Sequence, residues 1–73
     1  MVQRERGEYA DAARRLQAAW DLRPGWGDAG VPLADLRMVE GDRDAAVALL
    51  RAVLERDPDD VGARLRMDKI EGR

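Results

Sequence analysis

Apolar residues recur at helical spacing in two stretches of the chain that lie 34 residues apart. The first stretch carries Tyr9, Ala12, Ala13, Leu16, Ala19 and Trp20, and the second carries Ala46, Val47, Leu50, Val53 and Leu54. Spacings of three and four residues place such side chains on one face of an α-helix. Pro24 and Pro58 follow the stretches, and proline ends a helix because it cannot donate to the helical ladder. The pattern predicts helices over residues 8–22 and 43–57.

Two further helices are predicted over residues 29–40 and 60–70, which carry the apolar positions Leu33, Ala34, Leu36, Val39, Ala63, Met67 and Ile70. Asp28 is the expected N-cap of the earlier one, with Pro32 in its first turn, where a missing N–H costs little. Asp42 is the expected cap of the helix at 43–57, and Asp59 or Asp60 that of the last. No strand pattern interrupts them, so the predicted fold class is all-α.

The two stretches are copies of one another. Between residues 7–24 and 41–58, five identical pairs lie 34 residues apart, namely Gly7 and Gly41, Ala12 and Ala46, Leu16 and Leu50, Ala18 and Ala52, and Pro24 and Pro58. Self-similarity at a fixed period of this length is typical of stacked repeat architectures, in which each unit buries its apolar face against its neighbours.

These residues resemble the tetratricopeptide repeat. The second-helix pattern of that family is matched in the first copy by Gly7, Tyr9, Ala12, Leu16, Ala19 and Pro24, and in the second copy by Gly41, Ala46, Leu50 and Pro58. Leu33 and Ala34 match the apolar and small positions of the first helix. The resemblance implies a short solenoid of antiparallel helix-turn-helix repeats with about four helices. It also implies a protein–protein interaction or assembly module, and not an enzyme.

The departures from the family pattern fall in the first helix of the complete repeat. The family usually has a bulky aromatic residue early in this helix and a tyrosine in its middle, where this chain has Gly30 and Arg37. We therefore expect this helix to be underpacked and to be the weak element.

The period divides the chain into one domain over residues 1–73, with a partial repeat at 1–26, a full repeat at 27–60 and a partial or capping helix at 61–73. Residues 1–6 are expected where the end of a preceding first helix would lie, which would leave one side of the helix at 8–22 incompletely covered. The ending Ile70–Arg73 either continues the last helix or is the remnant of a protease recognition site, and the sequence does not decide between them.

Composition narrows the chemistry. The chain of 73 residues has no Cys or His, so it has no disulfide and lacks the usual ligands of a structural zinc ion. Ser and Thr are absent as well, which removes the common nucleophiles. Carboxylates are plentiful, so a carboxylate-based enzyme is the remote alternative. The acidic run at Asp57–Asp60 lacks the spacing and glycine of a calcium loop, so we interpret it as helix capping. No cofactor or metal is expected.

Charge and hydropathy limit the partners. The net charge of −2 argues against nucleic acid. No apolar run is long enough to cross a membrane, and the N-terminal residues do not form a secretory signal. Together with the absence of cysteine, this predicts a cytoplasmic protein whose partner is a protein or peptide, with no nucleic acid and no membrane.

Self-association is the first predicted mode of binding. So small a domain buries little surface and usually needs an additional source of stability. Without disulfides or a zinc site, oligomerisation or binding to a partner remains. The expected edge carries Tyr9, Leu16 and Trp20, which a second copy would cover in a homodimer. In the alternative, Trp20 packs on the helix at 29–40 within one chain.

The second predicted mode is peptide binding on the inner surface, which the family resemblance assigns to the first helix of each pair, here as part of a larger solenoid. Its residues would be Trp26, Asp28, Val31, Asp35, Met38, Val39, Leu65 and Lys69. Alternatively, Met38 and Leu65 fill small gaps in the core. The family's clamp for a terminal carboxylate needs Asn, which this chain lacks.

Overall fold

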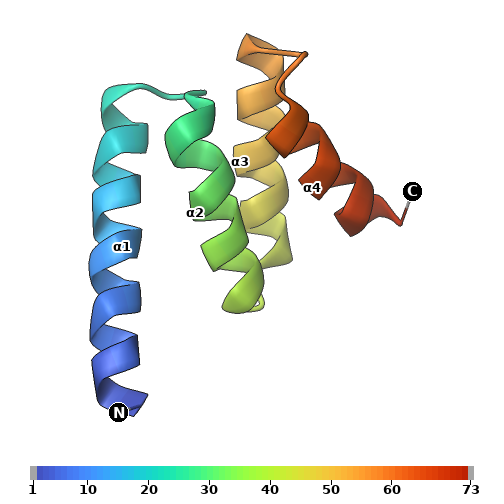
Figure 1. Cartoon of the computed structure of the whole chain (residues 1–73). Helices are drawn as coiled ribbons and strands as arrows, with labels where there is room; N and C mark the ends of the chain where they lie inside the picture. The colour runs from blue at the N-terminus through green and yellow to red at the C-terminus, as the bar shows by residue number, and fades with distance from the viewer. Residues whose placement is uncertain (1, 73) are drawn as a thin grey trace.

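Four helices make up the computed structural model, which describes residues 2–72 and the side chains from Gly7 to Gly72. They are α1 (Val2–Leu22), α2 (Gly27–Val39), α3 (Arg43–Arg56) and α4 (Val61–Glu71) (Figure 1). The all-α class and the four helices are as the sequence predicts. The division into partial repeat, full repeat and closing helix stays a prediction.

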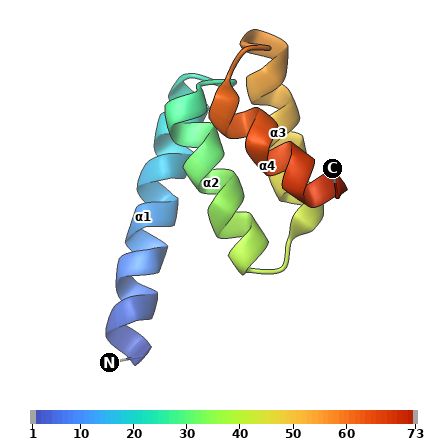
Figure 2. The same cartoon turned by 45° about the vertical axis from the view of Figure 1, so that its right-hand side comes forward.

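Consecutive helices run antiparallel and lie in a row (Figures 1 and 2). The most extensive packing joins α2 to α3, while α4 packs on α3 and on α2, and α1 packs on α2. The N-terminal turns of α1 extend past the turn that joins α2 to α3. α2 therefore has three neighbours and α3 has two, as expected of a stacked array in which a helix also meets the equivalent helix of the next repeat.

The core lies between α2, α3 and α4. All but one of its buried members come from the predicted apolar faces, and they are Ala34, Ala46, Leu50, Val53, Ala63 and Met67. The remaining member is Val31, which the sequence had assigned to the inner binding face. Ala29 and Leu33 are buried outside this cluster, on the stripe of α2 that also carries Leu36. α2 is thus covered on both sides, by α3 and α4 on one and by α1 on the other.

The predicted start of the first helix is wrong. α1 begins at Val2, so residues 2–6 continue this helix and are not the end of a preceding one. Gly7 lies within α1, and a Cβ atom there would meet nothing within 4 Å. Its repeat equivalent Gly41 has a φ of +84° in the turn between α2 and α3, a conformation that favours glycine. The equivalent glycines therefore lie inside a helix in the first copy and in a turn in the second.

The predicted cap of α2 is also wrong. Trp26 is the N-cap and makes no side-chain capping bond. Asp28 lies in the first turn, where its negative charge interacts favourably with the positive end of the helix dipole. Pro32 comes in the second turn, one turn later than expected. With Gly27 already helical, the missing N–H of Pro32 falls inside the helix, where it removes a bond to the carbonyl of Asp28.

The other two caps are confirmed. The Asp42 carboxylate accepts a hydrogen bond from the Ala45 amide at 3.1 Å, and the Asp60 carboxylate accepts one from the Ala63 amide at 2.9 Å. Each satisfies an amide that has no partner within its helix. α3 and α4 consequently begin within one residue of their predicted starts.

The expectation that α2 is underpacked is wrong. Five of its residues, Ala29, Gly30, Val31, Leu33 and Ala34, are buried. A Cβ atom at Gly30 would lie 2.5 Å from the Trp20 ring and 2.6 Å from a Val53 methyl group. The space that an aromatic residue of α2 would occupy is thus filled from α1 by Trp20.

Within residues 2–72, none of the helices is long and apolar enough to cross a membrane.

Candidate functional site

α2 and α4 contact one another, and Figure 2 shows them as neighbours. Hollows lined by residues of both helices form a groove between them. Toward the C-terminal ends of the two helices, the groove deepens into a hollow of about 200 Å³. We call this the α2–α4 hollow, and its lining residues are Ala34, Asp35, Met38, Leu50, Arg66, Lys69 and Ile70. The lining is apolar apart from three charged side chains, so the hollow suits an apolar side chain held beside a charged group.

Asp35 and Arg66 bridge the groove. The Arg66 Nε atom lies 3.2 Å from Asp35 Oδ1, and its Nη2 atom lies 3.3 Å from Asp35 Oδ2. This paired geometry is the strong form of an Arg–carboxylate contact, although both side chains remain partly exposed. The bridge spans the groove from α2 to α4, and both of its side chains line the α2–α4 hollow.

Lys69 supplies the remaining charge. It is exposed, and among the described residues it forms no ion pair. Because Arg66 is neutralised by Asp35, the rim of the α2–α4 hollow carries one uncompensated positive charge. A carboxylate would be attracted to this position.

The opposite end of the groove has the other sign. A second hollow, of about 380 Å³, is lined by Gly27, Asp28, Val31, Pro32, Asp60 and Gly62. Trp26 precedes it and is 36% exposed, with the Arg23 guanidinium 5.5 Å from the centre of its ring. The groove is therefore acidic near the helix N-termini and basic near the C-termini, which gives it a direction.

The structure distributes the predicted inner-face residues unevenly. Val31 is buried in the core, whereas Met38, Leu65 and Val39 are exposed at 40%, 55% and 75%. Met38 lines the α2–α4 hollow, and Leu65 lines a neighbouring hollow that shares Asp35, Arg66 and Lys69 with it. The exposure of both shows that they do not simply fill gaps in the core.

Sequence reasoning did not single out Arg66, and it placed Ile70 only among the apolar positions of the last helix. The available signal was the spacing of 31 residues between Asp35 and Arg66, close to the repeat period. Positions separated by about one period lie on neighbouring helices of the same type. A charge pair at that spacing is a candidate for a bridge across the groove.

The tetratricopeptide repeat model matches residues 3–67, which is most of the chain. The chain belongs to the tetratricopeptide repeat family. Searches of curated proteins and of solved structures gave no match. Tetratricopeptide repeats are protein–protein interaction modules and are typically not enzymes.

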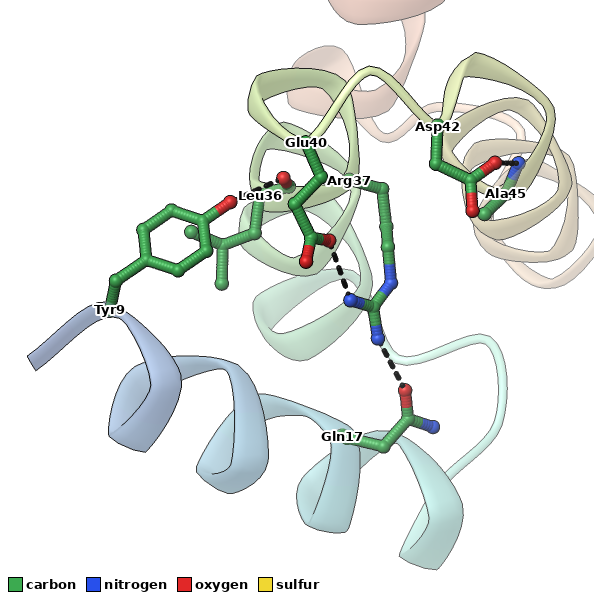
Figure 3. Close-up of polar contacts among 7 residues, drawn as sticks. All are labelled: Tyr9, Gln17, Leu36, Arg37, Glu40, Asp42 and Ala45. Atoms are coloured by element: carbon green, nitrogen blue, oxygen red, sulfur yellow. Dashed lines mark hydrogen bonds and ion pairs between the residues drawn. The ribbon is translucent and has the colours of Figure 1, made fainter. Parts of the chain in front are cut away.

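The predicted self-association edge is partly used inside this tetratricopeptide chain. The Tyr9 hydroxyl donates to the Leu36 carbonyl at 2.5 Å (Figure 3). Beside it, the Arg37 guanidinium donates to Glu40 at 2.7 Å and to Gln17 at 3.3 Å, which joins α1 to α2. Tyr9 therefore points into the α1–α2 contact.

Trp20 also packs within the chain. Its ring lies over Gly30 and against the core cluster, as the alternative interpretation expected. Leu16, the third residue of the predicted edge, is half-buried. Whether copies associate through this edge stays a prediction.

Burial raises the pKa of the Tyr9 hydroxyl above its ordinary value of about 10, and the nearby Glu40 carboxylate raises it further, while the Arg37 guanidinium acts in the opposite direction. The neutral phenol is thus favoured in the folded chain. Its contribution to stability is complete below the unfolded pKa, near 10, and is lost as the pH rises through the higher folded pKa.

We expect the phenolate absorbance of this single tyrosine to appear at higher pH in the folded protein than in urea. Glu40→Gln should lower the folded midpoint, because it removes the neighbouring negative charge. Glu55→Gln, an exposed change on α3, is the matched control and should leave it unchanged. A folded midpoint at or below the value in urea would contradict this prediction.

The acidic segment before α4 is occupied by local bonds. The Asp57 carboxylate accepts a hydrogen bond from the Asp59 amide at 3.1 Å, and Asp60 caps the helix. In the part of the chain that the structure describes, no group of three or more acidic residues is arranged to hold a metal ion. The capping interpretation accounts for these side chains.

Proposed function

We propose that this chain is a protein-interaction and assembly module with two binding surfaces, the α2–α4 hollow and the uncovered side of α1. The observation that carries the first surface is the hollow itself, an apolar lining beside an uncompensated Lys69. It favours a protein segment that presents an apolar side chain next to a carboxylate. The acidic end of the groove favours a basic group further along the same segment.

In this proposal, the apolar lining of the hollow holds one side chain of the bound segment, and the charges at the two ends of the groove set the direction in which the segment lies. Met38 and Ile70 line the hollow with flexible or branched apolar groups, and methionine adapts to different partners. A charge at the rim contributes mainly to selection among partners. The segment would therefore be chosen by its acidic–apolar pattern more than by high affinity.

Two labelled peptides that differ only in charge test this surface by fluorescence anisotropy. One has leucine flanked by glutamates, and the other has leucine flanked by lysines. We expect the acidic peptide to bind more tightly and Lys69→Glu to weaken its binding about fivefold, the effect of about 1 kcal/mol for an exposed charge pair.

Arg64→Glu is the matched control, because Arg64 is an exposed cation on another side of α4. It should change the affinity for the acidic peptide little. Equal binding of the two peptides, or equal losses in the two variants, would mean that the α2–α4 hollow does not select carboxylates.

A second candidate function, self-association, is favoured by a separate observation. Among the described helices, the backbone of α1 packs on α2 alone, so one side of α1 has no neighbour. Mass measured by light scattering over a hundredfold range of concentration tests it. A mass of one chain throughout would exclude self-association and leave peptide binding in the α2–α4 hollow as the proposed function.

A further inference from the structure

The repeat register identifies side chains of α1 that occupy core positions without a cover. In the second copy, Ala46, Leu50 and Val53 are 0% exposed. Their equivalents 34 residues earlier are Ala12, Leu16 and Ala19, which we call the α1 stripe. Ala12 is exposed, and the other two are only half-buried. The first copy thus keeps apolar residues at positions where the second copy buries them completely.

Ala12 and Ala19 of the α1 stripe lie beside the face of α1 that packs on α2, and the half-buried Leu16 lies at the border between the two. That contact uses Tyr9 and Trp20, through the hydrogen bond to Leu36 and the packing over Gly30. At 100° per residue, Ala12 and Ala19 lie well to one side of Trp20 on the helix surface. Covering the stripe therefore does not require α1 to leave α2.

The far end of a second copy is a poor cover for the α1 stripe. In α2, the small residues Gly30 and Ala34 allow close contact with the next helix. Their equivalents in α4 are Arg64 and Asp68, both exposed. Burying these charges against Leu16 would cost their hydration without a partner. End-to-end stacking of copies through these two positions of α4 is thus disfavoured.

We infer that the α1 stripe is covered by the same stripe of a second copy, with the two α1 helices antiparallel about a two-fold axis. The inference rests on the proposed self-association and specifies its geometry. Ala12 of one copy faces the partner's Ala19, and the small side chains allow the helices to approach closely. Leu16 and the partner's Leu16 meet beside the axis, so the interface is isologous.

Charges at the ends of the α1 stripe fit the antiparallel arrangement. Glu8 lies one turn before Ala12, and Arg23 lies one turn after Ala19. Antiparallel helices bring Glu8 near the partner's Arg23 at both ends, whereas parallel helices would place like charges together. Arg15, beside the axis, is long enough to lay its methylene groups over the partner's Leu16 while its guanidinium stays in water.

The interface is small, because α1 spans only about 31 Å. We therefore expect reversible association, with the mass rising from one chain to two over a hundredfold increase in concentration. Ala12→Glu should hold the protein at the mass of one chain. Ala18→Glu, an exposed alanine on the other side of α1, is the matched control and should associate like the parent. A mass of one chain for the parent at every concentration, or association that Ala12→Glu leaves intact, would overturn the inference.

Disulfide cross-linking tests the orientation, because the chain has no cysteine of its own. A mixture of Ala12→Cys and Ala19→Cys should form a mixed disulfide dimer. Ala12→Cys alone should cross-link poorly, because seven residues of helix separate the two copies of position 12 by at least about 10 Å, beyond the reach of a disulfide. Efficient self-cross-linking of Ala12→Cys, in protein that still forms two-chain particles, would overturn the antiparallel geometry and leave self-association standing.

Peptide binding in the α2–α4 hollow is measured separately, so loss of the dimer does not alter that result. A monomer that binds the acidic peptide would refute the dimer and keep the interaction module. A dimer that binds neither peptide would support the dimer and refute peptide binding in the α2–α4 hollow.

Discussion

Leu50→Ala is expected to remove a large part of the stability of this domain. Leu50 is fully buried at the centre of the cluster that joins α2, α3 and α4. Truncating a buried leucine costs about 2–5 kcal/mol, from the lost burial and the cavity left behind. At roughly 0.05–0.15 kcal/mol per residue, a chain of 73 residues has a free energy of unfolding of about 4–11 kcal/mol. The variant should unfold at much lower urea concentration, as measured by helical circular dichroism.

Leu16→Ala is the matched control, because Leu16 occupies the equivalent position in the first copy. In dilute protein, where the proposed dimer would be dissociated, truncating this half-exposed side chain should cost only about 1 kcal/mol. If a second copy covers the α1 stripe as proposed, the cost should grow with concentration. Equal costs for the two variants in dilute protein would show that Leu16 is buried within one chain.

Gly30→Ala should also destabilise the fold, although alanine is the better helix former. A Cβ atom there would lie 2.5 Å from the Trp20 ring and 2.6 Å from a Val53 methyl group, so at least one of these side chains must move. Overpacking of this kind costs about 1–3 kcal/mol, which outweighs a gain of about 0.5–1 kcal/mol in helix propensity. Urea unfolding should show the loss, and tryptophan fluorescence should report the displacement of Trp20.

Gly7→Ala is the opposite test within the same class of change. Gly7 lies inside α1, and a Cβ atom there would meet nothing within 4 Å. The substitution should therefore stabilise the chain by about 0.5–1 kcal/mol through helix propensity alone. If Gly30→Ala proved as stabilising as Gly7→Ala, Trp20 would not be packed on Gly30 as described.

Local signals predicted the helix bounds well where the capping or helix-ending residues were unambiguous. Asp42 and Pro58 bracket α3, and its observed bounds differ from the prediction by a single residue at one end. Asp60 similarly marks the start of α4. Gly7 misled the prediction of α1, because a glycine is compatible both with a turn and with an exposed helix position. Only the observed backbone separates Gly7 from Gly41.

The features that depend on three-dimensional packing were beyond local reasoning. The Asp35–Arg66 bridge requires a particular angle between α2 and α4, which no local pattern specifies. The Trp20 ring of α1 fills the space that the missing side chain of Gly30 leaves on α2. Taken alone, Gly30 was interpreted as a departure from the family pattern and Trp20 as part of an exposed edge. The family resemblance pointed to the helices that form the groove but could not separate the buried Val31 from the exposed Leu65.

The number of neighbours that each helix has also determines which part of the molecule opens first. Among the described helices, α3 is held by α2 and α4, whereas the backbone of α1 rests on α2 alone. Opening of α1 therefore breaks one contact surface and leaves the core between α2, α3 and α4 in place. Native-state hydrogen exchange should follow this gradient, with the amides of α1 exchanging through a partial opening and those of α3 only through global unfolding. A partner that covers α1 would then make the opening of α1, the first step of unfolding, less favourable.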